Sequence, residues 1–572
     1  MIDRARLLLR SVQHIWAPRS RSAVLVAAGL VLASGGYSPS ASPDTTSGPE
    51  RRTAPVYCLL GSGAIGVSER VDNCTNLTVV ADDRNVLKAE YEAGFIQGHL
   101  QGVSIGQARD NFWLGCFEDA PPANYLAASN TLLNQNLAAF VGYLRSNPGT
   151  PATLGLTRQL FRMLGIYHGA TLAEPKHLDF SGEWLPDSSY FTAAELQTNY
   201  GTPGLTFLDV YFVNAWEDLS SVFATMPQLW QQPTSEQRAI RPWPFSRRLP
   251  QHCSAFVKRT HGDILMAHTS WASYWAESMT MTLQINHDRV TMNTLSPGQL
   301  GSMTDFGFNN KGIMFNETTS GGMNEPVKVD GVFIFWRAAV AEELSGSLDD
   351  FFKYISLDNT GTYLNTYMLV DSNTKEIGLV DMSSSHFVFF RSSGGPYTIT
   401  TLPEGGSTDY DPTMVDPDYI LGYNYPPSMQ CRNDLQPGDN STPDRTTQLD
   451  EQVPALTNVT EAKATITFFD PLYVDSVMSR YDLDIASNPY VPGPFGAIDA
   501  KVGTASMAQS FKHLSGTFDP WGGTPGFWMK FGTARYNGEP FIWSASPWAS
   551  LPHPGVPDRL DGSFAQVNYH LR

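Results

Sequence analysis

Hydrophobic and polar positions recur with helical spacing in some parts of this chain and with strand spacing in others. The change of spacing divides the chain into predicted helical and strand regions. Over residues 84–147 the apolar positions follow helical spacing, which predicts helical structure that ends at Pro148-Gly149. A further helix is expected over 153–169, and two more within 186–232. The apolar stripe of the first region, which we expect to face the core, contains Leu126, Leu133, Leu137, Phe140, Val141 and Leu144.

Runs of strand length lie on both sides of these helices. Short strands are expected between Val56 and Val80. Later strands are expected at 254–258, 263–267, 278–292, 312–319, 367–371, 376–381 and 386–390. Residues 332–343 are interpreted as a strand running into a helix, 403–457 as loops, and 458–572 as helix mixed with irregular segments. Helices first, strands in the middle and helices again predict a layered α+β sandwich.

The first two of the later strands form a predicted hairpin with a reactive residue at each end. His261-Gly262-Asp263 supplies the turn, Cys253 precedes the first strand, and His268 follows the second. A thiol at a strand start that faces an imidazole on the neighbouring strand is the layout of an N-terminal-nucleophile hydrolase. This hypothesis requires cleavage of the peptide bond between His252 and Cys253.

Composition narrows the class of protein. The 572 residues are 42% hydrophobic and 12% aromatic, as in a globular protein with a large core. The net charge of -18 disfavours nucleic acid as a partner, because phosphate binding requires clustered Lys and Arg. The sequence has no HExxH motif, no phosphate-binding loop and no GxSxG elbow, so we expect no metal or other cofactor.

The chain has five cysteines, and none has the CxxC spacing of a zinc site. An odd number in an exported protein predicts two disulfides and one free thiol. We assign the free thiol to Cys253 because of its position in the hairpin. The other four allow three pairings, and we favour Cys58 with Cys74, which are closest in sequence.

The N-terminus has the features of a targeting segment. Five arginines within residues 4–21 precede an apolar run over 23–33, which is short for a membrane span. We expect a cleaved signal peptide within 1–40, with an uncleaved signal anchor as the alternative, and a linker over 41–55. Export to a secreted or lysosomal location is also favoured by several glycosylation sequons, of which we expect those at Asn73, Asn76 and Asn458 to be used and set aside Asn440 because Pro443 follows it.

Cys253 is the candidate nucleophile, because a thiolate is suited to acyl transfer. Once the chain is cut before it, its own α-amino group, with a reference pKa of about 7.7–8.0, can accept the thiol proton. Cleavage needs no protease in principle: the thiol attacks the carbonyl of His252, and water hydrolyses the resulting thioester. Taken alone, a cysteine is more often a packed core residue.

Polar residues at other strand ends are candidate partners. His268 can bond the thiolate or position a substrate carbonyl, and Asn365, Thr318 and Thr319 can donate to a developing oxyanion. Their spacing is equally compatible with structural roles, as a satisfied buried histidine and as turn or cap residues. The residues alone leave both readings open.

These segments also match the motifs of one family, in order along the chain. His252-Cys-Ser-Ala-Phe-Val-Lys258, with Leu265-Met-Ala-His-Thr-Ser-Trp-Ala-Ser-Tyr274, resembles the cysteine and histidine core of the phospholipase B-like (lamina ancestor) proteins, members of the N-terminal-nucleophile superfamily. Further segments are similar to that family at Tyr91–Gly98, Gly312–Thr319, Gly361–Asp371, Gly496–Val502, Phe541–Ser544 and His553–Asp558.

The resemblance implies a four-layer αββα sandwich. It also implies self-cleavage into an N-terminal helical chain, 56–252, and a catalytic chain, 253–572, that remain associated. In this interpretation Cys253 is the nucleophile and the polar partners are His268, Asn365, Thr318 and Thr319. Thr269 replaces the family's usual Asn after the histidine, which puts substrate positioning in doubt.

The activity implied by the resemblance is removal of fatty acyl groups from phospholipids, which is compatible with contact at a membrane surface. The first alternative is an amidase of N-acyl substrates, because the same thiol and amine serve both reactions. The second is a lipid-binding protein whose cysteine serves only in maturation.

Overall fold

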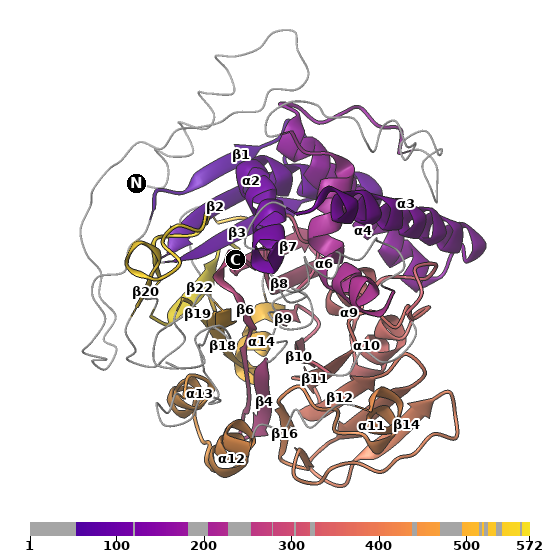
Figure 1. The fold of residues 1–572 in the computed structure, drawn as a ribbon, viewed down its shortest axis with the longest axis vertical. Helices are drawn as coiled ribbons and strands as arrows, with labels where there is room; N and C mark the ends of the chain where they lie inside the picture. The colour runs from indigo at the N-terminus through magenta and orange to yellow at the C-terminus, as the bar shows by residue number, and fades with distance from the viewer. Residues whose placement is uncertain are drawn as a thin grey trace, which may run out of the picture.

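Two large sheets, two smaller strand pairs and ten helices make up the part of the chain that the computed structural model describes (Figure 1). The described residues are 53–71, 73–117, 121–180, 204–226, 253–276, 278–302, 305–320, 327–436, 443–468, 495–513, 517–519, 524–532, 540–560 and 563–571.

The larger sheet has eleven strands in the order β1-β2-β3-β7-β8-β9-β10-β11-β12-β13-β14. Every neighbouring pair is antiparallel except β3 and β7, which run parallel. The strands are β1 (Val56–Leu59), β2 (Ile65–Val71), β3 (Cys74–Ala81), β7 (Met279–Ile285), β8 (Arg289–Leu295), β9 (Phe306–Asn309), β10 (Ile313–Thr319), β11 (Asn365–Asp371), β12 (Glu376–Met382), β13 (Phe387–Ser392) and β14 (Thr398–Leu402). The parallel pair joins segments on either side of the expected cleavage site.

The smaller sheet has seven antiparallel strands in the order β15-β16-β4-β5-β18-β19-β22. Its strands are β15 (Val415–Asp416), β16 (Tyr419–Gly422), β4 (Ser254–Arg259), β5 (Ile264–Thr269), β18 (Asp499–Thr504), β19 (Thr524–Phe531) and β22 (Ala565–Tyr569). The strand pairs are β6 (Trp271–Ser273) with β17 (Phe495–Ala497), and β20 (Phe541–Ile542) with β21 (Arg559–Leu560).

Helices gather around these sheets. They are α2 (Val86–Phe117), α3 (Ala123–Ser146), α4 (Pro151–Thr171), α6 (Phe207–Thr225), α9 (Ile334–Leu344), α10 (Leu348–Ile355), α11 (Met429–Leu435), α12 (Pro443–Gln452), α13 (Val459–Ile466) and α14 (Ala505–Lys512). Helices α2 and α4 pack so closely that a Cβ on Gly98 would lie 2.0 Å from the carbonyl oxygen of Ile166. Glycine is therefore needed at this crossing, because any side chain would push the helices apart.

The two sheets pack face to face. The Asn316 side chain on β10 donates to the carbonyl of Ala267 on β5 over 3.0 Å, and the rings of Phe306 and Phe527 lie 5.0 Å apart. Helices α2 and α9 pack on strands of the larger sheet, and α13 packs on β5 and β18 of the smaller one. The layers of helix and sheet agree with the predicted α+β class.

Most predicted elements after residue 253 are present. The hairpin is β4 and β5, with Gly262 at a φ of 106° in its turn, and the predicted meander is β11, β12 and β13. The helix expected over 153–169 is α4. The helical structure expected over 84–147 consists of two helices, α2 and α3.

Other predictions need correction. The strand expected at the start of 332–343 is only an isolated bridge at residue 332, whereas the helix expected after it is present as α9. The segment 458–572 contributes strands β18, β19 and β22 to the smaller sheet, which the pattern missed. In β18 every residue is buried, although Asp499 and Lys501 alternate with the apolar Ala500 and Val502. Leu126 of the predicted core stripe is 41% exposed.

The predicted disulfide between Cys58 and Cys74 is wrong. Cys58 has a free thiol and lies on β1, whereas Cys74 lies on β3. Strand β2 runs between them, and neighbouring strands are about 4.8 Å apart, so the two residues are too distant for a disulfide. Their side chains also pack in two different apolar clusters.

The described residues include the glycosylation sequons expected of an exported protein but not its targeting segment. The targeting segment and the linker up to residue 52 lie outside the described residues, and no described helix is both long and apolar enough to cross a membrane. Among the three sequons, Asn458 is exposed. Asn76 is buried within β3, which leaves no room for a sugar there, whereas Asn73 is partly buried.

Candidate active site

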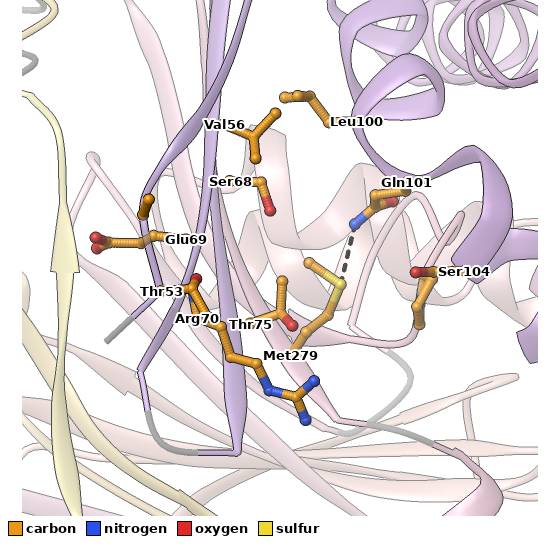
Figure 2. Close-up of a pocket in the computed structure, with 12 residues that line it drawn as sticks. Thr53, Val56, Ser68, Glu69, Arg70, Thr75, Leu100, Gln101, Ser104 and Met279 are labelled. Carbon is orange, nitrogen blue, oxygen red and sulfur yellow. Dashed lines mark hydrogen bonds between the residues drawn. The ribbon is translucent and has the colours of Figure 1, made fainter. Parts of the chain in front are cut away.

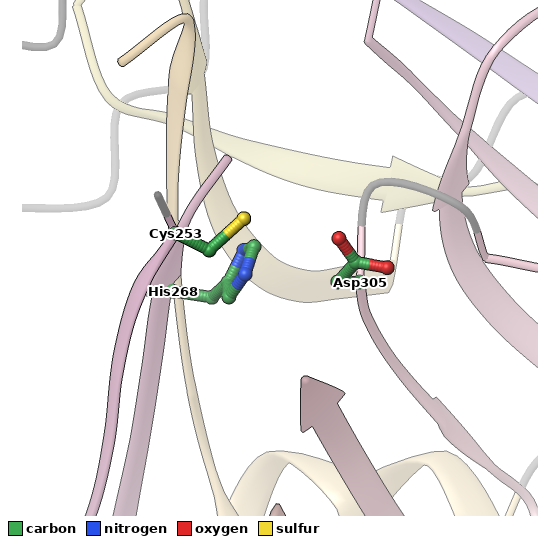
Figure 3. Close-up of side chains that lie close together, drawn as sticks. All are labelled: Cys253, His268 and Asp305. Atoms are coloured by element: carbon green, nitrogen blue, oxygen red, sulfur yellow. The ribbon is translucent and has the colours of Figure 1, made fainter. Parts of the chain in front are cut away.

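The β4–β5 hairpin brings Cys253 and His268 to one face of the smaller sheet. Cys253 lies immediately before β4, and the next residue but one, Ala255, pairs with His268 on β5. Because side chains alternate along a strand, the thiol and the imidazole lie on the same side. Asp305, just before β9, completes a buried group in which one ligand-type atom from each side chain lies within 4.8 Å of the others (Figure 3).

The surroundings of Cys253 keep its thiol protonated in the uncut chain. Burial raises the pKa of this thiol well above its usual value, and the carboxyl groups of Asp305 and Glu317 add to the rise. A hydrogen bond from the Trp271 backbone and the positive charge of Lys501 oppose the effect without overcoming it. A base close to the sulfur is therefore needed before it can react as a thiolate.

His268 is fully buried, and Lys501 on β18 lies beside it. The Lys501 Nζ is 3.1 Å from His268 Nδ1, 2.6 Å from Ser270 Oγ and 2.7 Å from Asp499 Oδ2. Burial, followed by the charge of Lys501, holds the pKa of His268 well below its usual value. The ring is therefore a neutral imidazole near pH 7.

A pair of carboxyl groups lies next to this centre. Phe306 pairs with Asn316 in the antiparallel ladder of β9 and β10. The residue before Phe306 is Asp305, which therefore lies opposite Glu317. Burial raises the pKa of Asp305 to about 7, and burial together with the charge of Asp305 raises that of Glu317 well above its usual value. Glu317 therefore holds a proton that it shares with Asp305, because two adjacent carboxylates cannot both ionise cheaply.

The structure separates the two predicted threonines. Thr318 faces the smaller sheet, where its side chain packs under Gly422, whereas Thr319 points to the opposite face with Glu317. There Thr319 Oγ1 donates to the hydroxyl of Tyr363 over 3.2 Å, and that hydroxyl donates to Glu317 Oε1 over 2.9 Å. Thr319 thus joins the carboxyl pair, and Thr318 does not.

Asn365 belongs to the same polar group as Thr319. It pairs with Thr319 across β10 and β11 and is fully buried. When its amide is oriented to satisfy the surrounding hydrogen bonds, its nitrogen donates to Glu317 Oε2 over 3.1 Å and to the carbonyl of Leu364 over 3.0 Å. Asn365 is thereby tied to Glu317 of the carboxyl pair.

A buried arginine holds the backbone at Cys253. Arg445 on α12 donates to the Cys253 carbonyl over 3.1 Å, to Asn424 Oδ1 over 3.1 Å and to the Tyr423 carbonyl over 2.7 Å. Its guanidinium also lies over the ring of Trp271. The backbone carbonyl of Cys253 itself is thereby held in place by a residue from a distant part of the chain.

Sequence reasoning did not identify Asp305, Asp499, Lys501 or Arg445 as members of the site. One signal was available: Lys501 and Asp499 are charged residues two apart within an apolar segment, which predicts a buried ion pair on one face of a strand. Asp305 and Arg445 carry no comparable local signal, because only the tertiary fold brings them to Cys253.

Thr269 faces away from the nucleophile. It follows His268 directly, so its side chain lies on the other face of β5, where its hydroxyl donates to the carbonyl of Asp499 over 2.8 Å. The residue that departs from the family pattern therefore supports the pairing of β5 with β18.

Cys253, His268 and Asp305 are residue types that bind zinc, but their surroundings do not fit a metal. A ligating imidazole offers one nitrogen lone pair to the metal and donates from its other nitrogen to an acceptor. Here Nδ1 faces the ammonium of Lys501, which can only donate. Nδ1 therefore lacks the acceptor that a metal-bound histidine needs.

Two cavities lie elsewhere, and neither is lined by the three clustered residues. The smaller, about 180 Å³, has a polar lining that includes Ser68, Arg70 and Gln101 (Figure 2). The larger, about 620 Å³, lies between α2, α3 and α6 with Trp113 and Phe212 among its lining residues. The lining of the larger cavity combines these rings with charged side chains such as Arg109 and Asp209.

A known protein family matches the part of the chain that carries most of the candidate site residues. The family model Phospholipase B matches residues 189–468, a segment that includes Cys253, His268, Asp305 and Glu317. Lys501 and Asp499 lie beyond the matched segment.

Whole-chain comparisons extend the match. Phospholipase B-like protein B of Dictyostelium discoideum is 22% identical over 518 residues, which cover 86% of this chain and 82% of that protein. Phospholipase B of Crotalus adamanteus is 24% identical over 79% of this chain and 80% of its own length. Phospholipase B-like 1 of Rattus norvegicus is 23% identical over 62% of this chain and 67% of its own length. The chain belongs to the phospholipase B-like family.

Proposed function

We propose that this protein is a phospholipase B-like acyl hydrolase that cuts its own chain between His252 and Cys253. It then removes fatty acyl groups from phospholipids through a thioester on Cys253. The observation that carries the proposal is the buried group of Cys253, His268 and Asp305 at the start of β4, in a family whose named members include phospholipases B. The proposed fold type is the αββα sandwich of N-terminal-nucleophile hydrolases.

Self-cleavage begins at the peptide bond before the nucleophile. The sulfur attacks the carbonyl carbon of His252, the C–N bond breaks, and the leaving nitrogen of Cys253 takes up a proton to become the free α-amine. Water then hydrolyses the thioester and releases the His252 carboxylate. Arg445 supports this step because it fixes the backbone on the other side of Cys253.

Cleavage also changes the base available to the thiol. In the uncut chain the pKa of Cys253 is raised by burial and by neighbouring carboxyl groups, so the thiol stays protonated. The new α-amine, with a reference pKa of about 7.7–8.0, can accept this proton. The thiolate then attacks the substrate ester, the alcohol leaves, and water activated by the same amine releases the fatty acid.

The two fragments would remain one folded unit after the cut. Strands β1–β3 belong to the N-terminal fragment, and β3 pairs with β7 of the other fragment over six residue pairs. A buried ion-pair network also crosses between them, where Arg289 binds Glu90 over 2.7 Å. The cut fragment is therefore expected to behave as a permanent partner.

Fragment sequencing tests the proposal first. Purified protein should contain a chain that begins at Cys253, and the Cys253→Ala variant should remain one uncut chain. Cys58→Ser is the matched control, because Cys58 is also a buried free thiol but lies on β1. It should be cut as the parent is. An uncut parent chain, kept for days at acidic pH, would contradict self-processing.

Product analysis tests the substrate. The processed protein should release fatty acid from phosphatidylcholine, and Cys253→Ala should not. An amidase is the second candidate, because the first reaction of the site is itself cleavage of an amide bond. Faster hydrolysis of an N-acyl amide than of phosphatidylcholine would favour the amidase. Correct processing with neither activity would leave the cysteine a role in maturation alone.

Location is proposed on sequence grounds. A secreted or lysosomal protein with a cleaved signal peptide fits the N-terminal segment and the exposed sequon at Asn458. Contact with a membrane surface would follow from a phospholipid substrate. Comparing the mass of the secreted protein with that of the full sequence tests the signal peptide.

A further inference from the structure

The side chain of Lys501 has an environment that limits what His268 can do. Its Nζ has three acceptors at hydrogen-bond distance, namely Asp499 Oδ2, Ser270 Oγ and His268 Nδ1, at 2.7, 2.6 and 3.1 Å. An ammonium has three N–H donors and no acceptor. Ser270 Oγ and His268 Nδ1 each take one of these hydrogens, and Asp499 Oδ2 lies against the ammonium as its ion-pair partner.

This geometry decides where the imidazole proton is. A nitrogen that accepts from an ammonium must present its lone pair, so Nδ1 carries no hydrogen and the proton of the neutral ring is on Nε2. Nε2 is buried and makes no hydrogen bond of good geometry with the described residues, although the Glu317 backbone lies near enough to the ring to raise its pKa against the effects of burial and Lys501. Neither nitrogen then has a lone pair free to take up a proton.

We infer that Lys501 is a positioning residue that holds His268 in the Nε2–H form, so that His268 acts as a hydrogen-bond donor to the substrate oxyanion and not as the base. The inference rests on the proposed acyl transfer and deepens it. A buried N–H that makes no hydrogen bond of good geometry is a preorganised donor, which is what a developing oxyanion requires. It also supplies the oxyanion donor that was expected of Asn365, because the amide of Asn365 donates to Glu317 instead.

The assignment divides the chemistry between two groups. Attack of the thiolate forms the S–C bond and moves the carbonyl electron pair onto oxygen, where Nε2–H stabilises the negative charge. Collapse of this intermediate breaks the C–O bond, and the leaving alkoxide takes the proton that the α-amine of Cys253 received from the thiol. His268 keeps its own proton throughout.

Solid-state ¹⁵N NMR of histidine-labelled protein tests the tautomer directly. The signal of His268 is identified by its loss in His268→Gln. We expect Nε2 to be protonated and Nδ1 unprotonated from pH 5 to pH 8. A protonated Nδ1, in either the other tautomer or the imidazolium, would overturn the inference. This measurement does not depend on any substrate, so it stands apart from the failure or success of the proposed hydrolase.

Kinetics test the role. If His268 is a donor, His268→Gln, whose amide also donates, should retain much more kcat than His268→Ala, which should lose about 10²–10³-fold. If the two variants are equally inactive although both are folded and cut, the donor role is wrong.

Lys501 is tested in a variant that does not leave a buried charge unpaired. Lys501→Met combined with Asp499→Asn removes both charges of the ion pair, and Lys501→Arg keeps a donor. The double variant removes the charge that helps burial to lower the pKa of His268, so kcat/KM should begin to decline on acidification at a higher pH than in the parent. Lys501→Arg should not show it. An unchanged pH profile in the double variant would contradict the positioning role.

Discussion

The guanidinium of Arg445 donates to the carbonyl oxygen of Cys253 over 3.1 Å, although 192 residues separate them in the sequence. This bond ties helix α12 to the start of β4, where the candidate nucleophile lies. Arg445 is fully buried, so its charge must be satisfied by these backbone and side-chain acceptors. The position of the candidate nucleophile thus depends on the segment that follows β16.

Replacing this arginine should impair both folding and processing. Arg445→Met leaves three buried acceptors without their donor, and each costs about 1–3 kcal/mol. We expect the free energy of unfolding to fall by at least about 3 kcal/mol, measured by urea denaturation. Self-cleavage, followed on denaturing gels well below the melting temperature, should slow.

Arg432→Met is the matched control. Arg432 lies on the neighbouring helix α11 and also donates to a backbone carbonyl and a carboxylate, but its contacts are with Pro426 and Asp411. Its loss should lower stability and leave the rate of cleavage unchanged. If both arginine variants slow cleavage equally, the effect of Arg445 is general destabilisation.

Stability should fall as the pH rises from about 4 to 7. The pKa of Asp305 is raised to about 7 by burial, whereas an unfolded aspartic acid titrates near 3.9. The folded state therefore holds the proton more tightly, and its contribution, on the order of a few kcal/mol, is present below pH 4 and lost towards pH 7. Glu342, with a pKa raised to about 8 by burial, acts in the same direction.

Urea unfolding of Cys253→Ala, which stays one chain, measures this slope. Adding Asp305→Asn should flatten it between pH 4 and 7. Adding Asp411→Asn should not, because hydrogen bonds from Arg432 and Thr413 outweigh burial and lower the pKa of Asp411, which is then ionised throughout this range. Stability that rises from pH 4 to 7 in the parent would refute the shared-proton pair.

Glycosylation should occur at Asn458 and not at Asn76. Asn458 is exposed at the start of α13, whereas Asn76 accepts a hydrogen bond from Thr280 within the larger sheet. Protein secreted from a glycosylating cell should lose the mass of one glycan in this region after Thr460→Ala. That change removes the sequon and keeps the Asn458 side chain, whose oxygen caps α13 by accepting from the Glu461 amide over 3.0 Å. A glycan found on Asn76 would show that β3 is not formed as described.

A buried ion-pair network should hold the two fragments together. Glu343 on α9 binds Arg162 over 3.2 Å and Arg289, and accepts from Gln159 over 2.6 Å. Glu343→Leu leaves the buried Arg162 and Arg289 with Glu90 as their one remaining carboxylate partner among the described residues, so we expect a loss of about 3–5 kcal/mol in unfolding free energy. The processed fragments should then separate at a lower urea concentration, as measured by size-exclusion chromatography.

The exposed pair of Arg391 and Asp349 provides the comparison. Asp349 is 63% exposed, and surface pairs contribute about 0–1 kcal/mol. Asp349→Asn should therefore change the urea midpoint little. Equal effects of the two substitutions would mean that the buried network contributes no more than a surface pair.

The sequence by itself determined the hairpin that carries Cys253 and His268. Its two apolar runs and the turn at Gly262 are local features, and the register that follows from them puts both side chains on one face. The helix over 153–169 and the meander of β11–β13 were predictable for the same reason, because each has its full period within a short segment.

Only the tertiary structure decided which distant groups reach that hairpin. Asp305, Arg445 and Lys501 meet Cys253 and His268 because the residue before β9, helix α12 and strand β18 come from distant parts of the chain to the β4–β5 hairpin, and such contacts leave no period in the chain. The tertiary structure also separated Thr318 from Thr319, since adjacent residues on a strand face opposite layers. It excluded the Cys58–Cys74 disulfide by placing β2 between the two strands. Local periodicity therefore set the elements, and packing between elements set the chemistry of the site.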